Sequence, residues 1–168
     1  MIAFQLDQCL DSKRFAKECH AEGLCQVQRF PSVLRNAEDP ELLMTLMVQA
    51  IPLVTFDRAL AHEHARFIPD NNPGIIVISN YPSPQTLTVS IAQKVLRRFK
   101  AGFPEWHQVA WRNSVVEITD IGVQVWYVQS GKLVRNEYLA FDAPGWQERL
   151  RAVLVENSHR GLPESGDV

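Results

Sequence analysis

Ile51-Pro52-Leu53-Val54-Thr55-Phe56-Asp57 is the segment around which the predicted fold of this chain is arranged. Five of its first six residues are apolar or proline, which is typical of a short buried strand. The stretch ends in a carboxylate, just before Arg58 begins a helical pattern. In open α/β sheets, ligands bind beyond the carboxyl ends of the parallel strands. We therefore expect Asp57 to face such a crevice, and we ask which other acids reach the same edge.

Strands and helices alternate on both sides of this stretch. The patterns predict a strand over 2–6, a helix over 12–21, a strand over 24–30, a helix that starts at 38–41 and runs over 42–49, a helix over 58–67 and a strand over 74–79. Asp39 is expected as N-cap of its helix, with Pro40 at the first helical position. The last of these strands is continuously apolar, as in a fully buried parallel strand. The alternation predicts an α/β fold with a mostly parallel central sheet and helices on both faces.

The character of the chain changes after about residue 84. Apolar residues recur every four positions to about residue 101, which predicts an amphipathic helix, and Pro104 ends it. Strands over 115–119, 122–129 and 132–141 and a closing helix over 145–155 follow, with Ser130-Gly131 as a hairpin turn. We expect one domain, with residues 1–103 as an α/β core, 104–156 as a C-terminal β-hairpin extension plus helix, and 157–168 as a flexible tail.

Length and composition indicate an ordinary globular protein. The 168 residues are enough for one domain with a real core, and 46% of them are hydrophobic and 21% charged. The formal net charge is −2, so nucleic-acid binding would need a local basic patch.

The cysteines and the N-terminus indicate a cytoplasmic protein that does not enter a membrane. Cys9, Cys19 and Cys25 form no CxxC pair, so we expect reduced thiols rather than a disulfide frame or a zinc site. The first residues lack a basic leader, and Asp7 interrupts their apolar run, which argues against a signal peptide. No apolar run approaches the roughly 18 residues that span a bilayer.

Three carboxylates are expected at one edge of the predicted sheet. Asp7 ends the first strand, Asp57 ends the organising strand, and Asp39 starts the helix that leads into it. Clustered carboxylates repel one another in a low-dielectric cleft unless a cation lies among them. Mg²⁺ and Mn²⁺ favour oxygen ligands and retain waters and phosphates in their remaining positions. Such a site orients a water molecule and stabilises the charge that develops during phosphodiester hydrolysis.

Four stretches of the first 80 residues form a characteristic set. They are Ala3-Phe4-Gln5-Leu6-Asp7, Asp39-Pro40-Glu41-Leu42-Leu43, Leu53-Val54-Thr55-Phe56-Asp57 and Pro73-Gly74-Ile75-Ile76-Val77-Ile78. Together they resemble a PIN-like domain, and in particular the short bacterial PIN-like proteins related to ribonuclease toxins. The resemblance implies a three-layer α/β/α fold and Mg²⁺- or Mn²⁺-dependent cleavage of RNA. It also implies that Asp7, Asp39 and Asp57 are the catalytic and metal-binding acids, and that an antitoxin or other protein is a partner.

The chain departs from that family pattern at two acids. The family often has Asp-Glu where this chain has Asp7-Gln8, and a second acid where this chain has Ala59. Two functions stay open: a divalent-metal-dependent ribonuclease, such as the toxin of a toxin–antitoxin pair, and a catalytically degenerate module that binds RNA or a protein. The role of the β extension stays open between joining two copies of the chain in a homodimer and docking an inhibitor. A phosphotransfer receiver-like domain is disfavoured, because no lysine follows the strand over 74–79 in the right place.

The candidate residues also have structural explanations. Asp39 and Asp57 are suited to cap helices, and Glu41 to stabilise a helix dipole. His62 and His64 diverge by about 200° on a helix, so they are expected as surface or hydrogen-bonded residues rather than a metal pair.

Basic and aromatic side chains offer a second set of candidates. Lys94, Arg97 and Arg98 lie off the apolar stripe of their helix and are candidates for contacts with RNA phosphates, although a solvated basic face is the simpler explanation. The four tryptophans are expected in the core or at an interface, with stacking on bases as the alternative.

Overall fold

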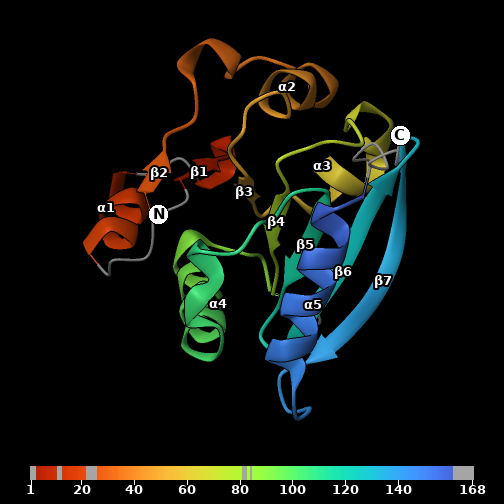
Figure 1. Cartoon of the computed structure of the whole chain (residues 1–168). Helices are drawn as coiled ribbons and strands as arrows, with labels where there is room; N and C mark the ends of the chain where they lie inside the picture. The colour runs from red at the N-terminus through yellow and green to blue at the C-terminus, as the bar shows by residue number, and fades with distance from the viewer. Residues whose placement is uncertain (1–2, 11–12, 22–25, 81–82, 84, 161–168) are drawn as a thin grey trace, which may run out of the picture.

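A computed structural model describes residues 3–10, 13–21, 26–80, 83 and 85–160 of the chain. Its frame is one seven-stranded sheet in the order β2-β1-β3-β4-β5-β6-β7 (Figure 1). The first five strands pair in parallel, whereas β6 pairs antiparallel with both β5 and β7. The strands are β1 (Ala3–Leu6), β2 (Gln26–Gln28), β3 (Leu53–Thr55), β4 (Ile75–Ile78), β5 (Ser114–Ile118), β6 (Gly122–Gln129) and β7 (Lys132–Ala140).

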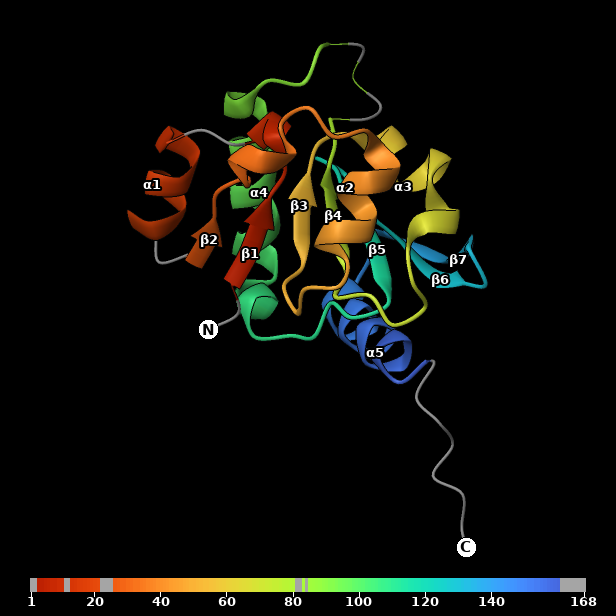
Figure 2. The ribbon, with the colours of Figure 1, turned by 90° about the horizontal axis from the view of Figure 1, so that it is seen from above.

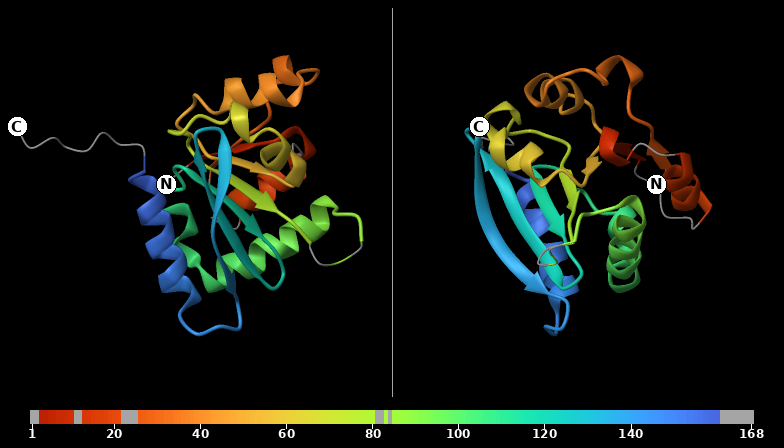
Figure 3. Two further views of the ribbon diagram at one scale, coloured as in Figure 1. Left: turned by 90° about the vertical axis from the view of Figure 1, so that its right-hand side faces the viewer. Right: turned by 180° about the vertical axis from the view of Figure 1, so that it is seen from behind.

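Helices cover both faces of this sheet, so the three-layer α/β/α arrangement expected from the sequence is present. Figure 3 shows α2 and α3 on one side of the sheet and α4 and α5 on the other. The α-helices are α1 (Lys13–Ala21), α2 (Asp39–Leu46), α3 (Arg58–Glu63), α4 (Val89–Gly102) and α5 (Trp146–Ser158). Short 3₁₀ turns are η1 (Gln8–Leu10), η2 (Ser32–Leu34), η3 (Ala65–Phe67) and η4 (Pro104–His107).

Two apolar cores lie on opposite faces of the sheet. Ile75 and Val77 of β4 pack with the residues of α2 and α3, whereas Ile76 and Ile78 pack with those of α1, α4 and α5. All four side chains are fully buried, so the continuous apolar run is a strand covered on both faces, as predicted.

The strand order places a topological switch point between β1 and β3. From β1 the chain moves to β2 at one edge, and then returns to the other side of β1 with β3 (Figure 2). Helices that leave the sheet on opposite sides open a crevice at this point, beyond the carboxyl ends of the strands. Asp7 follows β1 directly and Asp57 follows β3 by two residues, so both acids belong to this edge.

The helices around this edge differ from the prediction in two places. Asp39 is the first residue of α2 rather than its N-cap, and Glu38 occupies the cap position without a side-chain hydrogen bond. The helix expected over 58–67 is interrupted at His64, where the backbone leaves the helical region, and continues as η3. The two positions face each other, because Asp39 Oδ2 lies 3.3 Å from His64 Nε2.

The turn between β6 and β7 has the predicted form. Ser130 and Gly131 both have positive φ, 51° and 72°, and the flanking residues Gln129 and Lys132 pair across the strands. These angles are typical of the two-residue turns that match the twist of a β-hairpin. The Asp70 carboxylate accepts a hydrogen bond from the Ser130 amide at 2.9 Å, which joins the turn to the loop before β4.

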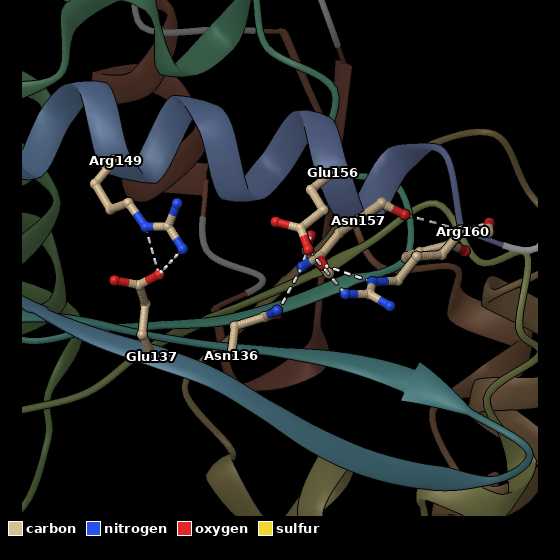
Figure 4. A network of polar contacts seen from close by, with 8 residues as sticks. Asn136, Glu137, Arg149, Glu156, Asn157 and Arg160 are labelled. Carbon is tan, nitrogen blue, oxygen red and sulfur yellow. Dashed lines mark hydrogen bonds and ion pairs between the residues drawn. The ribbon is translucent and has the colours of Figure 1, made fainter.

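The end of α5 is fixed to the sheet by a polar network (Figure 4). The buried Asn157 side chain donates to Ser114 Oγ at 3.1 Å and to Asn136 Oδ1 at 3.0 Å. Arg160 Nε donates to Asn157 Oδ1 at 3.2 Å. The closing helix therefore runs past its predicted end, and the expectation of a flexible tail from residue 157 is wrong for residues 157–160, whereas 161–168 lie outside the described residues.

Among the described residues, no helix combines the length and apolar content that crossing a bilayer requires.

We predict that Asn157→Ala lowers the free energy of unfolding by about 1–3 kcal/mol, because truncation leaves the buried Ser114 hydroxyl without its partner. Urea denaturation followed by circular dichroism measures this change. Val155→Ala, on the exposed side of the same helix, is the matched control and should cost about 0.5 kcal/mol or less. Equal effects of the two substitutions would show that the network does not hold α5.

Candidate functional site

A buried carboxylate lies at the centre of the candidate site. Asp7 is 7% exposed, directly after β1. Its Oδ2 accepts hydrogen bonds from Thr55 Oγ1 at 2.6 Å and from Cys9 Sγ at 3.3 Å. Its Oδ1 accepts one from the Gln8 amide at 2.7 Å. These three donors offset the cost of removing the carboxylate from water.

Thr55 joins the ends of β1 and β3. Its hydroxyl donates to the Asp7 carboxylate and accepts a hydrogen bond from the Asp57 amide at 2.9 Å, and the side chain is fully buried. Thr55 was not among the residues expected in the site. The signal that could have found it is its position as the one polar residue among the apolar and proline residues of the stretch 51–56.

Asp57 is exposed and caps α3. Its Oδ1 accepts a hydrogen bond from the Ala59 amide at 3.0 Å, so the structural explanation considered for this residue is present. Its Oδ2 has no hydrogen-bond partner among the described residues and is open to a further ligand.

The third predicted acid has a different neighbour. Asp39 Oδ2 lies 3.3 Å from His64 Nε2, at the junction of α3 and η3. In the part of the chain that the structure describes, no group of three or more His, Cys, Asp or Glu side chains is placed to hold a metal ion. The structure thus brings Asp7 and Asp57 to one edge, and it does not bring Asp39 into a three-acid group with them.

In the described part of the chain, the remaining candidates make no hydrogen bond with Asp7, Thr55 or Asp57. Glu41 is exposed in the first turn of α2, and Lys94, Arg97 and Arg98 are exposed on α4, across the sheet from α3. His62 packs edge-on against Trp126, with ring centroids 4.7 Å apart, and burial together with the nearby Arg58 charge lowers its pKa. His62 Nε2 is buried without a hydrogen-bond partner among the described residues, contrary to the expectation of a surface or hydrogen-bonded histidine.

No family model, no curated protein and no solved structure matches this chain. What the site can do therefore follows from its own residues.

The donor atoms at this edge suit a hard divalent cation. They are carboxylate oxygens of Asp7 and Asp57 with a threonine hydroxyl between their backbone segments. Mg²⁺ is commonly bound through one or two carboxylates, with waters and substrate phosphates in the other positions. The residues here that could hold such an ion are Asp7 and Asp57, and Asp57 Oδ2 is the carboxylate oxygen without a hydrogen-bond partner among the described residues.

Cys9 does not have the properties of a nucleophile. Burial and the adjacent Asp7 charge raise the pKa of its thiol to about 11, although hydrogen bonds from Thr55 and Phe56 oppose that shift. The reactive form of cysteine is the thiolate, which is scarce at neutral pH for such a group.

We predict slow alkylation of Cys9 in the folded protein. With a pKa of about 11, the thiolate fraction at pH 8 is about a thousandth, so iodoacetamide should react about 100-fold more slowly than with the urea-unfolded chain. The folded-state rate should rise as the pH approaches 11. Peptide mass spectrometry separates Cys9 from the other two cysteines, and equal folded and unfolded rates would contradict the prediction.

We predict that Thr55→Val destabilises the protein by about 1.5–3 kcal/mol, because it removes the donor to a buried carboxylate and the acceptor of the Asp57 amide. Thr55→Ser is the matched control, since it keeps the hydroxyl, and it should retain most of the stability. Thermal unfolding of the two variants measures the difference. A valine variant as stable as the serine variant would show that the hydroxyl does not hold the two segments together.

Proposed function

We propose that this protein is a divalent-metal-dependent ribonuclease whose site lies at the carboxyl edge between β1 and β3. The observation that carries the proposal is the Thr55 hydroxyl, which joins the Asp7 carboxylate to the Asp57 backbone at the switch point of the sheet. The resemblance of the four sequence stretches to PIN-like domains supports the same chemistry and RNA as the substrate.

The candidate residues have distinct roles in this proposal. Asp7 and Asp57 would hold Mg²⁺ or Mn²⁺, and the Thr55 bond keeps the Asp7 carboxylate oriented. The bound ion would supply an activated water and charge stabilisation at the scissile phosphate. Asp39, which lies against His64, serves the packing of α2 against η3 and not the reaction.

A second candidate function is a catalytically silent module that binds RNA or a protein partner, for example an antitoxin. It is favoured by Ala59 and Gln8, which stand where the resembled family often has acids. The hydrogen bond that the Ala59 amide donates to Asp57 Oδ1 also favours it, because this carboxylate already caps α3.

Asp57→Ser separates the two candidates. Serine remains a good N-cap but lacks the carboxylate, so α3 should be preserved while metal-dependent activity falls by roughly 100-fold or more. Cleavage of a fluorescent single-stranded RNA with Mn²⁺ measures the activity, and thermal unfolding confirms the fold. Asp7→Asn should also lose activity, and Asp39→Asn is the control that should retain it.

Two outcomes would contradict the ribonuclease. One is a wild-type protein that neither cleaves RNA with Mn²⁺ nor binds Mn²⁺ in a calorimetric titration. The other is full activity in the Asp57→Ser variant. Either result would favour the binding module.

A further inference from the structure

A pocket of about 420 Å³ opens beside α3, on the same face of the sheet. It begins at Arg58, the residue next to Asp57, so it adjoins the candidate site. Ligand pockets commonly have volumes of about 300–1,000 Å³, which places this one in the range for a small organic group. The side chains that give the pocket its chemistry are Arg58, Glu117, Gln124, Trp126, Arg135 and Tyr138.

A β-bulge brings Arg135 and Tyr138 to the same face of β7. Residues three apart on a regular strand point to opposite faces. Here Tyr138 pairs with Gln124 and Arg135 pairs with Trp126, so Asn136 is additional at the register shift. Asn136 Oδ1 accepts its hydrogen bond from Asn157 of α5, which holds the bulge from the other side of the sheet. Bulges that re-aim side chains in this way are frequent next to functional sites.

The charges of the pocket favour an anion. Glu117 is 3% exposed and accepts a hydrogen bond from Arg58 Nε at 2.6 Å, which orients a side chain that is still 55% exposed. Arg135 is exposed and makes no ion pair with another described residue. The lining of the pocket therefore presents two guanidinium groups and one buried carboxylate, and the Asp142 charge acts on Tyr138 from outside the lining. Planar guanidinium groups are well matched to phosphate oxygens.

Two partly exposed aromatic rings complete the pocket. Trp106, Trp111 and Trp146 are buried, whereas Trp126 is partly exposed at the pocket wall. Tyr138 is 41% exposed and lies over Gly122, where a Cβ atom would come within 2.5 Å of its hydroxyl. Aromatic side chains beside basic groups are the combination with which proteins bind single-stranded nucleic acids.

We propose that this pocket binds a nucleotide of single-stranded RNA, with the base against Trp126 and Tyr138 and a phosphate at Arg58 and Arg135. The inference rests on the proposed function for the choice of RNA, and it adds the path of the strand. A nucleotide in this pocket places the adjoining phosphodiester beside Asp57. The strand then crosses the β5–β7 face rather than the basic residues of α4.

Fluorescence anisotropy with a labelled hexauridylate tests the proposal, with the full chain in EDTA so that no hydrolysis occurs. Arg135→Ala and Tyr138→Ala should each weaken binding about tenfold, and both side chains are exposed enough for the fold to persist. Arg98→Ala is the matched control, because it removes one exposed arginine from the other face and should leave the affinity unchanged. Binding should also quench the tryptophan fluorescence of the wild type, since Trp126 lines the pocket.

Three results would overturn the pocket assignment. The first is no binding of hexauridylate by the wild type. The second is weakening by Arg98→Ala without weakening by Arg135→Ala, which would place the strand on α4. The third is equal binding of a hexaglutamate peptide with the same dependence on Arg135, which would indicate an acidic protein partner.

The Asp57→Ser variant keeps this test independent of the ribonuclease proposal. It should bind hexauridylate in EDTA with the wild-type affinity, because Asp57 does not line the pocket. Binding by the wild type without any metal-dependent cleavage would refute the hydrolytic function and leave the pocket assignment in place. Cleavage that is insensitive to Arg135→Ala and Tyr138→Ala would refute the pocket and leave the hydrolytic function in place.

Discussion

The hydrogen bond from the buried Thr55 hydroxyl to the buried Asp7 carboxylate is the constraint around which this edge of the protein is arranged. A buried carboxylate without hydrogen-bond donors would be costly, so Asp7 needs donors from the segments around it. Thr55 is supplied by β3, whereas Gln8 and Cys9 are supplied by the turn after β1. The same hydroxyl also accepts from the Asp57 amide, so one side chain positions both strand ends.

The sheet connects this edge to the second half of the chain. The parallel strands continue through β4 to β5, where Glu117 forms an ion pair with Arg58 at the start of α3. On the opposite face, α5 holds the bulge of β7 through Asn157 and Asn136. The antiparallel hairpin is therefore part of the same sheet as the candidate acids. Its exposed face carries the pocket that begins at Arg58, the residue next to Asp57.

In the proposed ribonuclease, the two acids and the adjoining basic aromatic pocket have separate tasks. In the proposal, Asp7 and Asp57 would provide oxygen ligands for a cation, and the guanidinium and aromatic groups next to them would provide contacts that need no metal. The departures at Gln8 and Ala59 concern the first task alone. The proposal therefore treats binding and hydrolysis as separable.

Elements with local signals could be predicted from the residues alone. The apolar run that became β4, the four-residue spacing that became α4 and the Ser130-Gly131 turn were all predictable, because periodicity and turn angles depend on neighbouring residues. The meeting of Asp7 with the end of β3 also followed from strand direction.

Only the tertiary structure decided the contacts that depend on strand register and on helix packing. Asp39 faces His64 because α2 packs against η3, and the Glu117–Arg58 ion pair joins residues 59 positions apart. The bulge at Asn136 changes which side chains of β7 share a face, and no local pattern marks it. Such contacts are selected by the packing of the whole chain, so residue spacing along the sequence does not reveal them.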